Sequence, residues 1–169
     1  ANSYLWNTGA TTQNIVVTTS GNYSVTVSIG NGCSASSSST AVTVNPLPTV
    51  TITPGSATTF CVGNSVTLTA SAGNSYLWSN NATTQSIIVS ASGSYSVTVT
   101  NANGCSATSS PTIVTVNPLP TAAITPSGAT TFCQGGNVTL TASTANSYLW
   151  NTGATTQNIV VTTSGNYSV

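Results

Sequence analysis

The sequence lacks every side chain that is charged at neutral pH: its 169 residues include no Asp, Glu, Lys, Arg or His. Without carboxylates, imidazoles, amines or guanidinium groups there is no general acid, general base or electrophilic clamp, so an enzyme is not expected. A Ser or Cys nucleophile would have no base to activate it. Lys and Arg also neutralise phosphates, so charge-driven binding of nucleic acid and a basic membrane patch are both excluded.

Other absences narrow the class of fold. Met is missing, and no window repeats apolar residues with the period of an amphipathic helix. No apolar run approaches the roughly 20 residues that cross a bilayer, so no membrane-spanning segment is expected. Ser and Thr, in contrast, make up more than a third of the chain and are mixed with Val, Ile and Tyr. This mixture favours strands, and we expect an all-β protein.

The chain repeats itself every 72 residues without insertion or deletion. Residues 2–6 (NSYLW) return as 74–78 and 146–150. Residues 1–25 are identical to residues 145–169, whereas the corresponding stretch of the middle copy differs at several positions. Both ends of the sequence fall inside a repeat, so we interpret the chain as a segment of a longer tandem-repeat protein.

Each repeat ends in a short linker with two prolines, residues 45–49 and 117–121 (NPLPT). Proline fixes φ and favours an extended path, so the linker is semi-rigid and neighbouring domains should follow one another head to tail. The expected domains are a partial repeat at 1–46 (strands C to G), a complete repeat at 47–118 and a partial repeat at 119–169 (strands A to F).

The complete repeat reads as about seven short strands. They are expected at residues 49–53, 65–71, 75–79, 84–90 (one strand or a pair of strands), 93–100 and 112–116, with turns at 80–81 and 101–104. Short strands separated by turn residues at this spacing are typical of a β-sandwich.

The order of the large side chains follows that of immunoglobulin domains, in which strands B and F carry Cys, strand C carries Trp, and a Tyr precedes the second Cys. Here Ala70 and Val97 stand near the two Cys positions, Trp78 lies in strand C, and Tyr95 has the place of the tyrosine corner. We therefore predict tandem immunoglobulin-like β-sandwich domains of about 72 residues. The expected core residues are Leu68, Ala70, Trp78, Ile88, Tyr95, Val97 and Val114, with Trp6 and Trp150 in the other repeats.

Four strings carry a family resemblance: SYLWNTGATTQNIVVTTSGNYSVTV, NANGCSA, TVNPLPT and TFCQGGNVTLTAS. They resemble the tandem immunoglobulin-like and PKD-like repeats of very large secreted surface proteins of Bacteroidota, gliding-motility-type adhesins among them. The resemblance covers the whole chain. It implies a long stalk or filament, exported by a type IX-like route and displayed at the cell surface. Related repeats usually contain some Asp, Glu or Lys, and this chain departs from them in having none.

The four cysteines follow the same 72-residue period. Cys33 and Cys105 lie at the turn between strands F and G, and Cys61 and Cys133 lie just before strand B. Strands B and F run in the same direction in an immunoglobulin-like fold, so Cys61 and Cys105 would lie at opposite ends of one domain. At about 3.3 Å per residue they would be roughly 30 Å apart, too far for a disulfide.

Three states of the cysteines stay open. The Cys before strand B can pair with the F–G Cys of the following domain, which would place a disulfide at each joint. A bond between Cys61 and Cys105 would contradict the expected strand order, and all four residues can also be free thiols. No Cys-x-x-Cys spacing occurs, so neither a metal site nor a cofactor is expected.

Covalent glycans are a further expectation. Asn-x-Ser/Thr triplets begin at Asn22, Asn81, Asn137 and Asn166, although such triplets arise readily by chance in a chain this rich in Ser and Thr. Hydroxyl runs that include Thr11, Thr12, Ser37 and Ser38 are candidates for O-glycosylation. An uncharged surface has no electrostatic repulsion to keep it dispersed, and a glycan coat would supply solubility.

Two functions are compatible with these features. The first is a structural repeat segment of an extracellular filament, stalk or adhesin shaft, whose partners are adjacent repeats or further copies of itself. The second is an adhesive module that recognises glycans or a surface through loop residues such as Tyr76, Asn80 and Asn81. In the second reading, the ring of Tyr76 or Trp78 would serve as a sugar-stacking platform.

Overall fold

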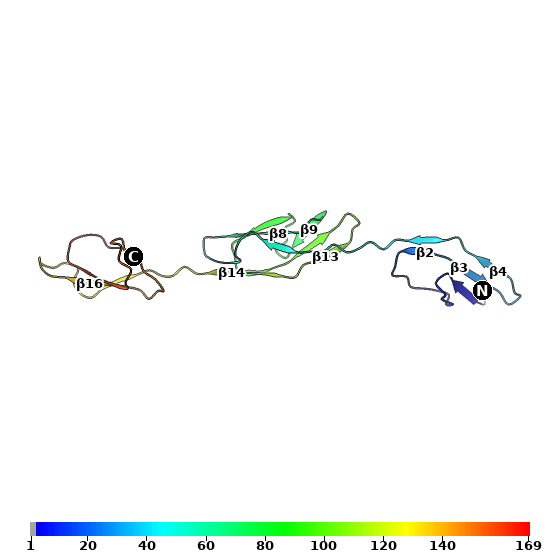
Figure 1. Ribbon diagram of the computed structural model, residues 1–169, viewed down its shortest axis with the longest axis horizontal. Coiled ribbons are helices and arrows are strands. Elements are labelled where there is room, and N and C mark those ends of the chain that lie inside the picture. Colours follow the sequence, from blue (N-terminus) through cyan, green and yellow to red (C-terminus); the bar gives the residue numbers. More distant parts are fainter. Residues whose placement is uncertain (1–2) are drawn as a thin grey trace. The chain divides into compact units, whose positions relative to one another are not determined.

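The computed structural model describes residues 3–169, and these residues form short strands and no helix (Figure 1). The all-β prediction is therefore confirmed, and the strands are arranged in several small sheets that are consistent with a β-sandwich. The chain divides into two compact units, one made of residues 1–58 and 66–114 and the other of residues 59–65 and 115–169.

The N-terminal part of the first unit contains a three-stranded sheet and a separate strand pair. In the sheet, β3 (Val25–Ser28) lies between β1 (Ser3–Trp6) and β4 (Ser34–Ser36), and both neighbours are antiparallel to it. The pair joins β2 (Gly21–Tyr23) to β5 (Thr40–Val42), also antiparallel.

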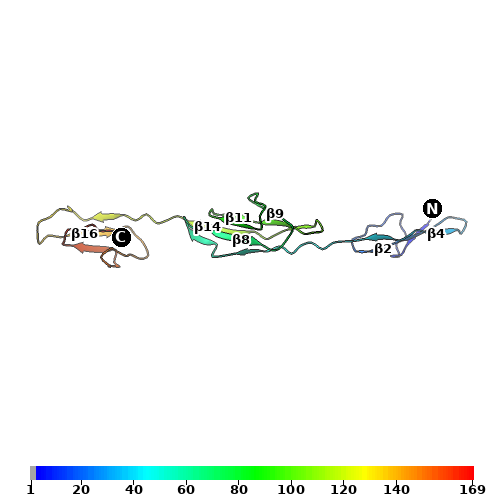
Figure 2. The same cartoon turned by 90° about the horizontal axis from the view of Figure 1, so that it is seen from above.

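The middle repeat contains three sheets, each with one central strand. In the first sheet β8 (Val66–Ala70) lies between β6 (Ile52–Pro54) and β10 (Ser86–Val89). In the second, β12 (Val97–Thr100) lies between β9 (Ser75–Trp78) and β13 (Ser106–Thr108). In the third, β14 (Thr112–Asn117) lies between β11 (Gly93–Tyr95) and β7 (Thr59–Cys61). All neighbours are antiparallel except β7, which runs parallel to β14. Figure 2 shows β11 and β14 close together.

The C-terminal part of the second unit repeats the first of these sheets. Its central strand β16 (Val138–Ala142) lies between β15 (Ile124–Pro126) and β17 (Asn158–Val161). Residues 131–133 and 165–167, which correspond to β7 and β11 of the middle repeat, are not in strands here.

Apolar side chains alternate along these strands and form the core. In β8 and β16 the first, third and fifth residues of the sequence VTLTA are buried, which is the pattern of a strand with one inward face. The fully buried large side chains are Val66, Leu68, Trp78, Val97, Val99, Val114 and Trp150. Ala70 is also buried, whereas Trp6 and Tyr95 are half-buried.

The core prediction for Ile88 is wrong. Ile88 is 75% exposed, and its neighbour Ile87 is 7% exposed. The register explains the difference, because Ile87 lies directly opposite the buried Leu68 of β8, and residues directly opposite each other point to the same face of a sheet. The run Ile87-Ile88-Val89 has no alternation of its own from which this face could be read.

Several strand boundaries also differ from the sequence prediction. The first strand of the middle repeat is β6, at the end of the predicted range 49–53. The predicted strand 93–100 is two strands, since β11 pairs with β14 whereas β12 pairs with β9. The break falls at Ser96, whose amide donates to Ser79 Oγ at 3.2 Å and whose carbonyl oxygen accepts from the Ser79 amide at 2.9 Å.

Two side-chain anchors recur in all three repeats. The indole Nε1 of Trp6, Trp78 and Trp150 donates to a main-chain carbonyl oxygen six residues later, at 2.9, 2.8 and 2.8 Å. The Tyr95 hydroxyl donates to the carbonyl oxygen of Ala91 at 3.0 Å, and the Tyr at the same position of the other repeats does so at 2.8 and 2.9 Å. A Tyr hydroxyl that bonds back to the main chain a few residues upstream is the bond of a tyrosine corner.

Candidate functional site

The prediction that Tyr76 lies in a glycan-contacting loop is wrong, because Tyr76 and Trp78 both lie in β9, and Asn80 and Asn81 lie in the turn that follows. Trp78 is buried, so its ring is not available as an exposed stacking platform. The Tyr76 hydroxyl accepts from the Gly73 amide at 2.9 Å and donates to the Gly73 carbonyl oxygen at 3.1 Å. At the following turn, Asn80 Oδ1 accepts from the Ala82 amide at 3.2 Å.

The predicted glycosylation sites are all exposed: Asn22, Asn81, Asn137, Asn166, Thr11, Thr12, Ser37 and Ser38. Two of the hydroxyls already make internal hydrogen bonds. Thr12 Oγ1 donates to a main-chain carbonyl oxygen at 2.6 Å, and Ser37 Oγ donates to the carbonyl oxygen of Ser38 at 2.9 Å. Asn81 has a φ of 68°, a left-handed conformation that Asn tolerates in a turn.

The four cysteines carry no disulfide in the structure, and Cys105 is the one that is half-buried. Cys105 lies against the linker that precedes its repeat, where its Sγ is 3.8 Å from the carbonyl oxygen of Asn45. Asn101, at the start of the same turn, donates from Nδ2 to the carbonyl oxygen of Pro46 at 3.0 Å. The turn at residues 101–105 of the middle repeat thus contacts two successive carbonyl groups of the linker.

Cys61 lies beside the linker that follows its repeat. In the parallel pairing of β7 with β14, Cys61 is the register partner of Asn117, the first residue of that linker. Asn117 occupies the same repeat position as Asn45. The two cysteines of the middle repeat are therefore each associated with the first residue of a linker, Cys105 with the preceding one and Cys61 with the following one.

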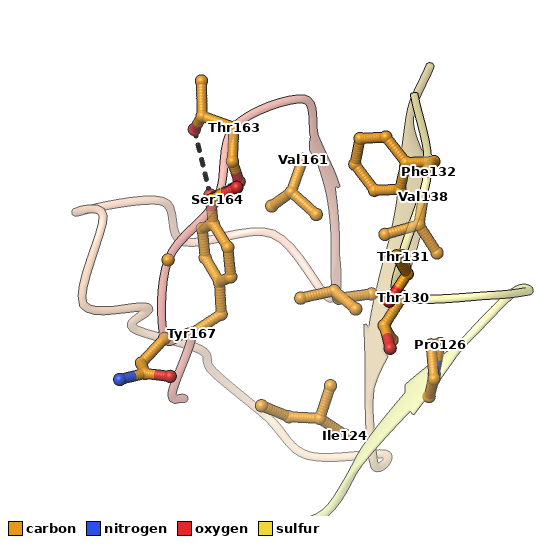
Figure 3. Close-up of a pocket in the computed structure, with 13 residues that line it drawn as sticks. Ile124, Pro126, Thr130, Thr131, Phe132, Val138, Val161, Thr163, Ser164 and Tyr167 are labelled. Atoms are coloured by element: carbon orange, nitrogen blue, oxygen red, sulfur yellow. Dashed lines mark hydrogen bonds between the residues drawn. The ribbon is translucent and has the colours of Figure 1, made fainter. Parts of the chain in front are cut away.

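A cavity of about 540 Å³ lies in the C-terminal part (Figure 3). Figure 3 shows Phe132 and Val138 on one side of it, Tyr167 on the other, and Val161 between them. The Tyr167 hydroxyl is fixed by its bond to the carbonyl oxygen of Thr163 at 2.9 Å. The lining residues of this cavity are Ile124, Pro126, Thr130–Phe132, Val138, Leu140, Val161 and Thr163–Tyr167.

Residues 3–169 contain no group of three or more residues that could hold a metal ion, and no helix long and apolar enough to cross a membrane. Within the same residues, every buried side-chain nitrogen or oxygen atom has a hydrogen-bond partner.

Two features of the middle repeat were not anticipated from the sequence. The first is β7, a strand of three residues whose sequence TFC does not alternate enough to predict pairing. The second is Ser109, which is 8% exposed and accepts the Val97 amide on Oγ at 3.2 Å. Ser37, at the same position of the preceding repeat, accepts the Val25 amide on Oγ at 3.1 Å. In both repeats the Ser follows the Val by 12 residues, and this shared spacing is the sequence signal from which the bond could have been predicted.

Known proteins give no further guide to the family. No protein-family model matches the chain, and no curated protein matches its sequence.

Proposed function

We propose that this chain is a structural repeat segment of an extracellular filament, stalk or adhesin shaft. The observation that carries the proposal is the recurrence of one module, with the same Trp and Tyr anchors at the same positions of each 72-residue repeat. The polar groups of the module are used to hold its own main chain, which favours a structural role over ligand recognition.

Each module is proposed to be an immunoglobulin-like β-sandwich domain. In this assignment β8 is strand B, β9 is strand C, β11 and β12 form strand F, and β13 and β14 form strand G. The pairing of β8 with β6 and β10, and of β12 with β9 and β13, supports the assignment. The bond of the Tyr95 hydroxyl to Ala91 supports it as well, since it is the bond expected of the tyrosine corner.

We further propose a disulfide at each joint between repeats. Cys105 lies beside Asn45 of the preceding linker, and Cys61 lies beside Asn117 of the following linker. Asn45 and Asn117 have the same position in the repeat. In a continuing array each linker Asn would therefore have two cysteines beside it: the counterpart of Cys61 from the repeat before the linker and the counterpart of Cys105 from the repeat after it. Formation of the bond removes two protons and two electrons from the two thiols, which an extracellular thiol–disulfide oxidoreductase would accept. The bond would limit bending at the joint.

Peptide mapping of native, unreduced material tests this pairing. Alternate repeats have different cysteine peptides: CVGN at Cys61 and CQGG at Cys133, and IGNGC at Cys33 and NANGC at Cys105. Chymotrypsin is suitable because it cleaves after aromatic residues. Pairing with the following repeat joins CVGN to IGNGC, whereas CVGN joined to NANGC, or four alkylated thiols, would refute the joint disulfide.

We also propose that the surface carries covalent glycans, which the exposure of all predicted acceptor residues supports.

Negative-stain electron microscopy of the native material tests the structural function itself. The proposal predicts continuous fibres. It also predicts that mass spectrometry of the fibre subunit gives a mass above that of its polypeptide, because of the attached glycans. Dispersed single molecules whose hydrodynamic size changes on addition of a glycan would instead support the adhesive module.

A further inference from the structure

The side chain of Asn101 connects the turn at residues 101–105 to the linker before it. Its Oδ1 accepts from the amides of Asn103 and Cys105, both at 3.0 Å. Its Nδ2 donates to the carbonyl oxygen of Pro46 at 3.0 Å. A single orientation of the carboxamide satisfies all three partners, because a turned group would place Nδ2 against two amide donors and Oδ1 against a carbonyl oxygen. The three bonds therefore fix this half-buried side chain at both of its ends.

The carbonyl group that accepts this bond is the one that the prolines of the linker leave free to turn. The rings of Pro46 and Pro48 fix φ at these two residues. Asn45 and Leu47 each precede a proline, which holds their ψ in the extended range. Between the two prolines, ψ of Pro46 is left without such a restriction, and this torsion sets the direction of the Pro46 carbonyl group. The bond from Asn101 therefore acts on the torsion through which the linker can still change its path.

The other kind of repeat has a side chain at this position that cannot form the bond. Ile29 has the place of Asn101, and its side chain can neither donate to a linker carbonyl oxygen nor accept from amides of the turn. The turn itself is retained. The carbonyl oxygen of Ile29 accepts from the Gly32 amide at 3.1 Å, and the equivalent main-chain bond closes the turn of Asn101 at 3.1 Å. Exchange of Asn for Ile thus removes the contact with the linker and keeps the turn.

The two kinds of repeat alternate along the chain, because residues 1–25 and 145–169 are identical and the middle copy differs from them. A linker before a repeat of the middle kind therefore meets an Asn in the turn, and a linker before the other kind meets an Ile.

We propose that Asn101 is a clamp on the preceding linker, and that a tandem array has clamped and unclamped joints in alternation. A shaft built in this way is stiffer at every second joint. This consequence for a shaft rests on the structural function proposed above, whereas the clamp itself is a property of the chain.

Amide relaxation measured by NMR tests the clamp in the 169-residue chain, at pH 7 and under reducing conditions so that no disulfide contributes. The Leu47 amide belongs to the same peptide group as the Pro46 carbonyl oxygen, so its order parameter reports on the clamped group directly. A rigid main chain has an order parameter of about 0.85, and a flexible one has a value below about 0.6. We expect Leu47 to lie in the rigid range in the parent chain.

Three substitutions separate the clamp from the turn. Asn101→Asp keeps an oxygen for the Asn103 and Cys105 amides but sets a second, charged oxygen against the Pro46 carbonyl oxygen, so Leu47 should move into the flexible range. Asn101→Ile introduces the side chain of the other repeat and should have the same effect on Leu47. Asn103→Asp is the matched control, because it adds the same charge at an exposed residue of the turn, and it should leave Leu47 in the rigid range.

Each result decides one part of the proposal. A flexible Leu47 in the parent chain, or an unchanged Leu47 in Asn101→Asp, would overturn the clamp. A rigid Leu47 in Asn101→Ile would overturn the alternation, because the Ile turn would then hold the linker as well as the Asn turn does. Unchanged amide signals of β12 show in each chain that the middle repeat is folded.

The clamp and the structural function can fail separately. If Leu47 responds as expected but the native material consists of dispersed molecules, the structural function is wrong and the clamp remains. If native fibres exist but Leu47 responds to neither substitution of Asn101, the clamp is wrong and the structural function remains.

Discussion

Removal of the Ser109 hydroxyl should destabilise the middle repeat far more than removal of its counterpart in the N-terminal part. Ser109 and Val97 form two hydrogen bonds: the Ser109 amide donates to the Val97 carbonyl oxygen at 2.9 Å, and the Val97 amide donates to Ser109 Oγ at 3.2 Å. Ser109→Ala keeps the first bond and leaves the Val97 amide buried without an acceptor. A buried amide without an acceptor lowers the free energy of unfolding by about 1–3 kcal/mol.

Ser37→Ala is the matched control. The Val25 amide donates to Ser37 Oγ at 3.1 Å, but Ser37 is exposed, so water can replace the hydroxyl. We expect its free energy of unfolding to change by less than about 0.5 kcal/mol. Comparison of the two substitutions separates the cost of a buried unsatisfied amide from the loss of a hydroxyl as such.

The measurement is urea unfolding followed by the fluorescence of one Trp. For Ser109→Ala this is Trp78, with Trp6 and Trp150 replaced by Phe, and for Ser37→Ala it is Trp6, with Trp78 and Trp150 replaced by Phe; each is compared with the chain that has the same Phe replacements. The midpoint should fall in Ser109→Ala, and the melting temperature should fall by about 4–8 °C for each kcal/mol if the repeat unfolds as a unit. Equal effects of Ser109→Ala and Ser37→Ala, or a loss below about 0.5 kcal/mol in Ser109→Ala, would refute the reasoning.

Three further predictions concern the register, the missing charges and the tyrosine corner. Ile87→Ala should cost about 2–5 kcal/mol of unfolding free energy and Ile88→Ala less than about 0.5 kcal/mol, because only Ile87 is buried; a reversed order in urea titrations would contradict the register of β10 on β8. The urea midpoint should be the same at pH 4.5 and pH 7, in low and high NaCl, because the chain has no Asp, Glu, His, Lys or Arg; a shift worth more than about 0.5 kcal/mol would contradict this expectation. Tyr95→Phe should cost about 0.5–1.5 kcal/mol through loss of the bond to Ala91, and no change in midpoint would show that this bond does not contribute.

The sequence was sufficient to predict an all-β chain and the place of most strands. β8 alternates along VTLTA, and the turn at residues 101–104 has a Gly at position 104, where φ is 78°. It was insufficient where a contact between distant segments decides the outcome. Ile87 and Ile88 are chemically equal, and only the pairing with β8 selects which one is buried. The three residues of β7 become a strand only because β14 lies beside them.

The glycan-binding loop was favoured by residue type alone, and the internal bonds of Tyr76 and Asn80 argue against it.

The most direct test of the account is a cryo-electron microscopy map of fibres of the native material. The account predicts a continuous row of domains that repeat every 72 residues, each with the Trp and Tyr anchors of this structure. Dispersed single molecules, or fibres without this 72-residue repeat, would contradict it.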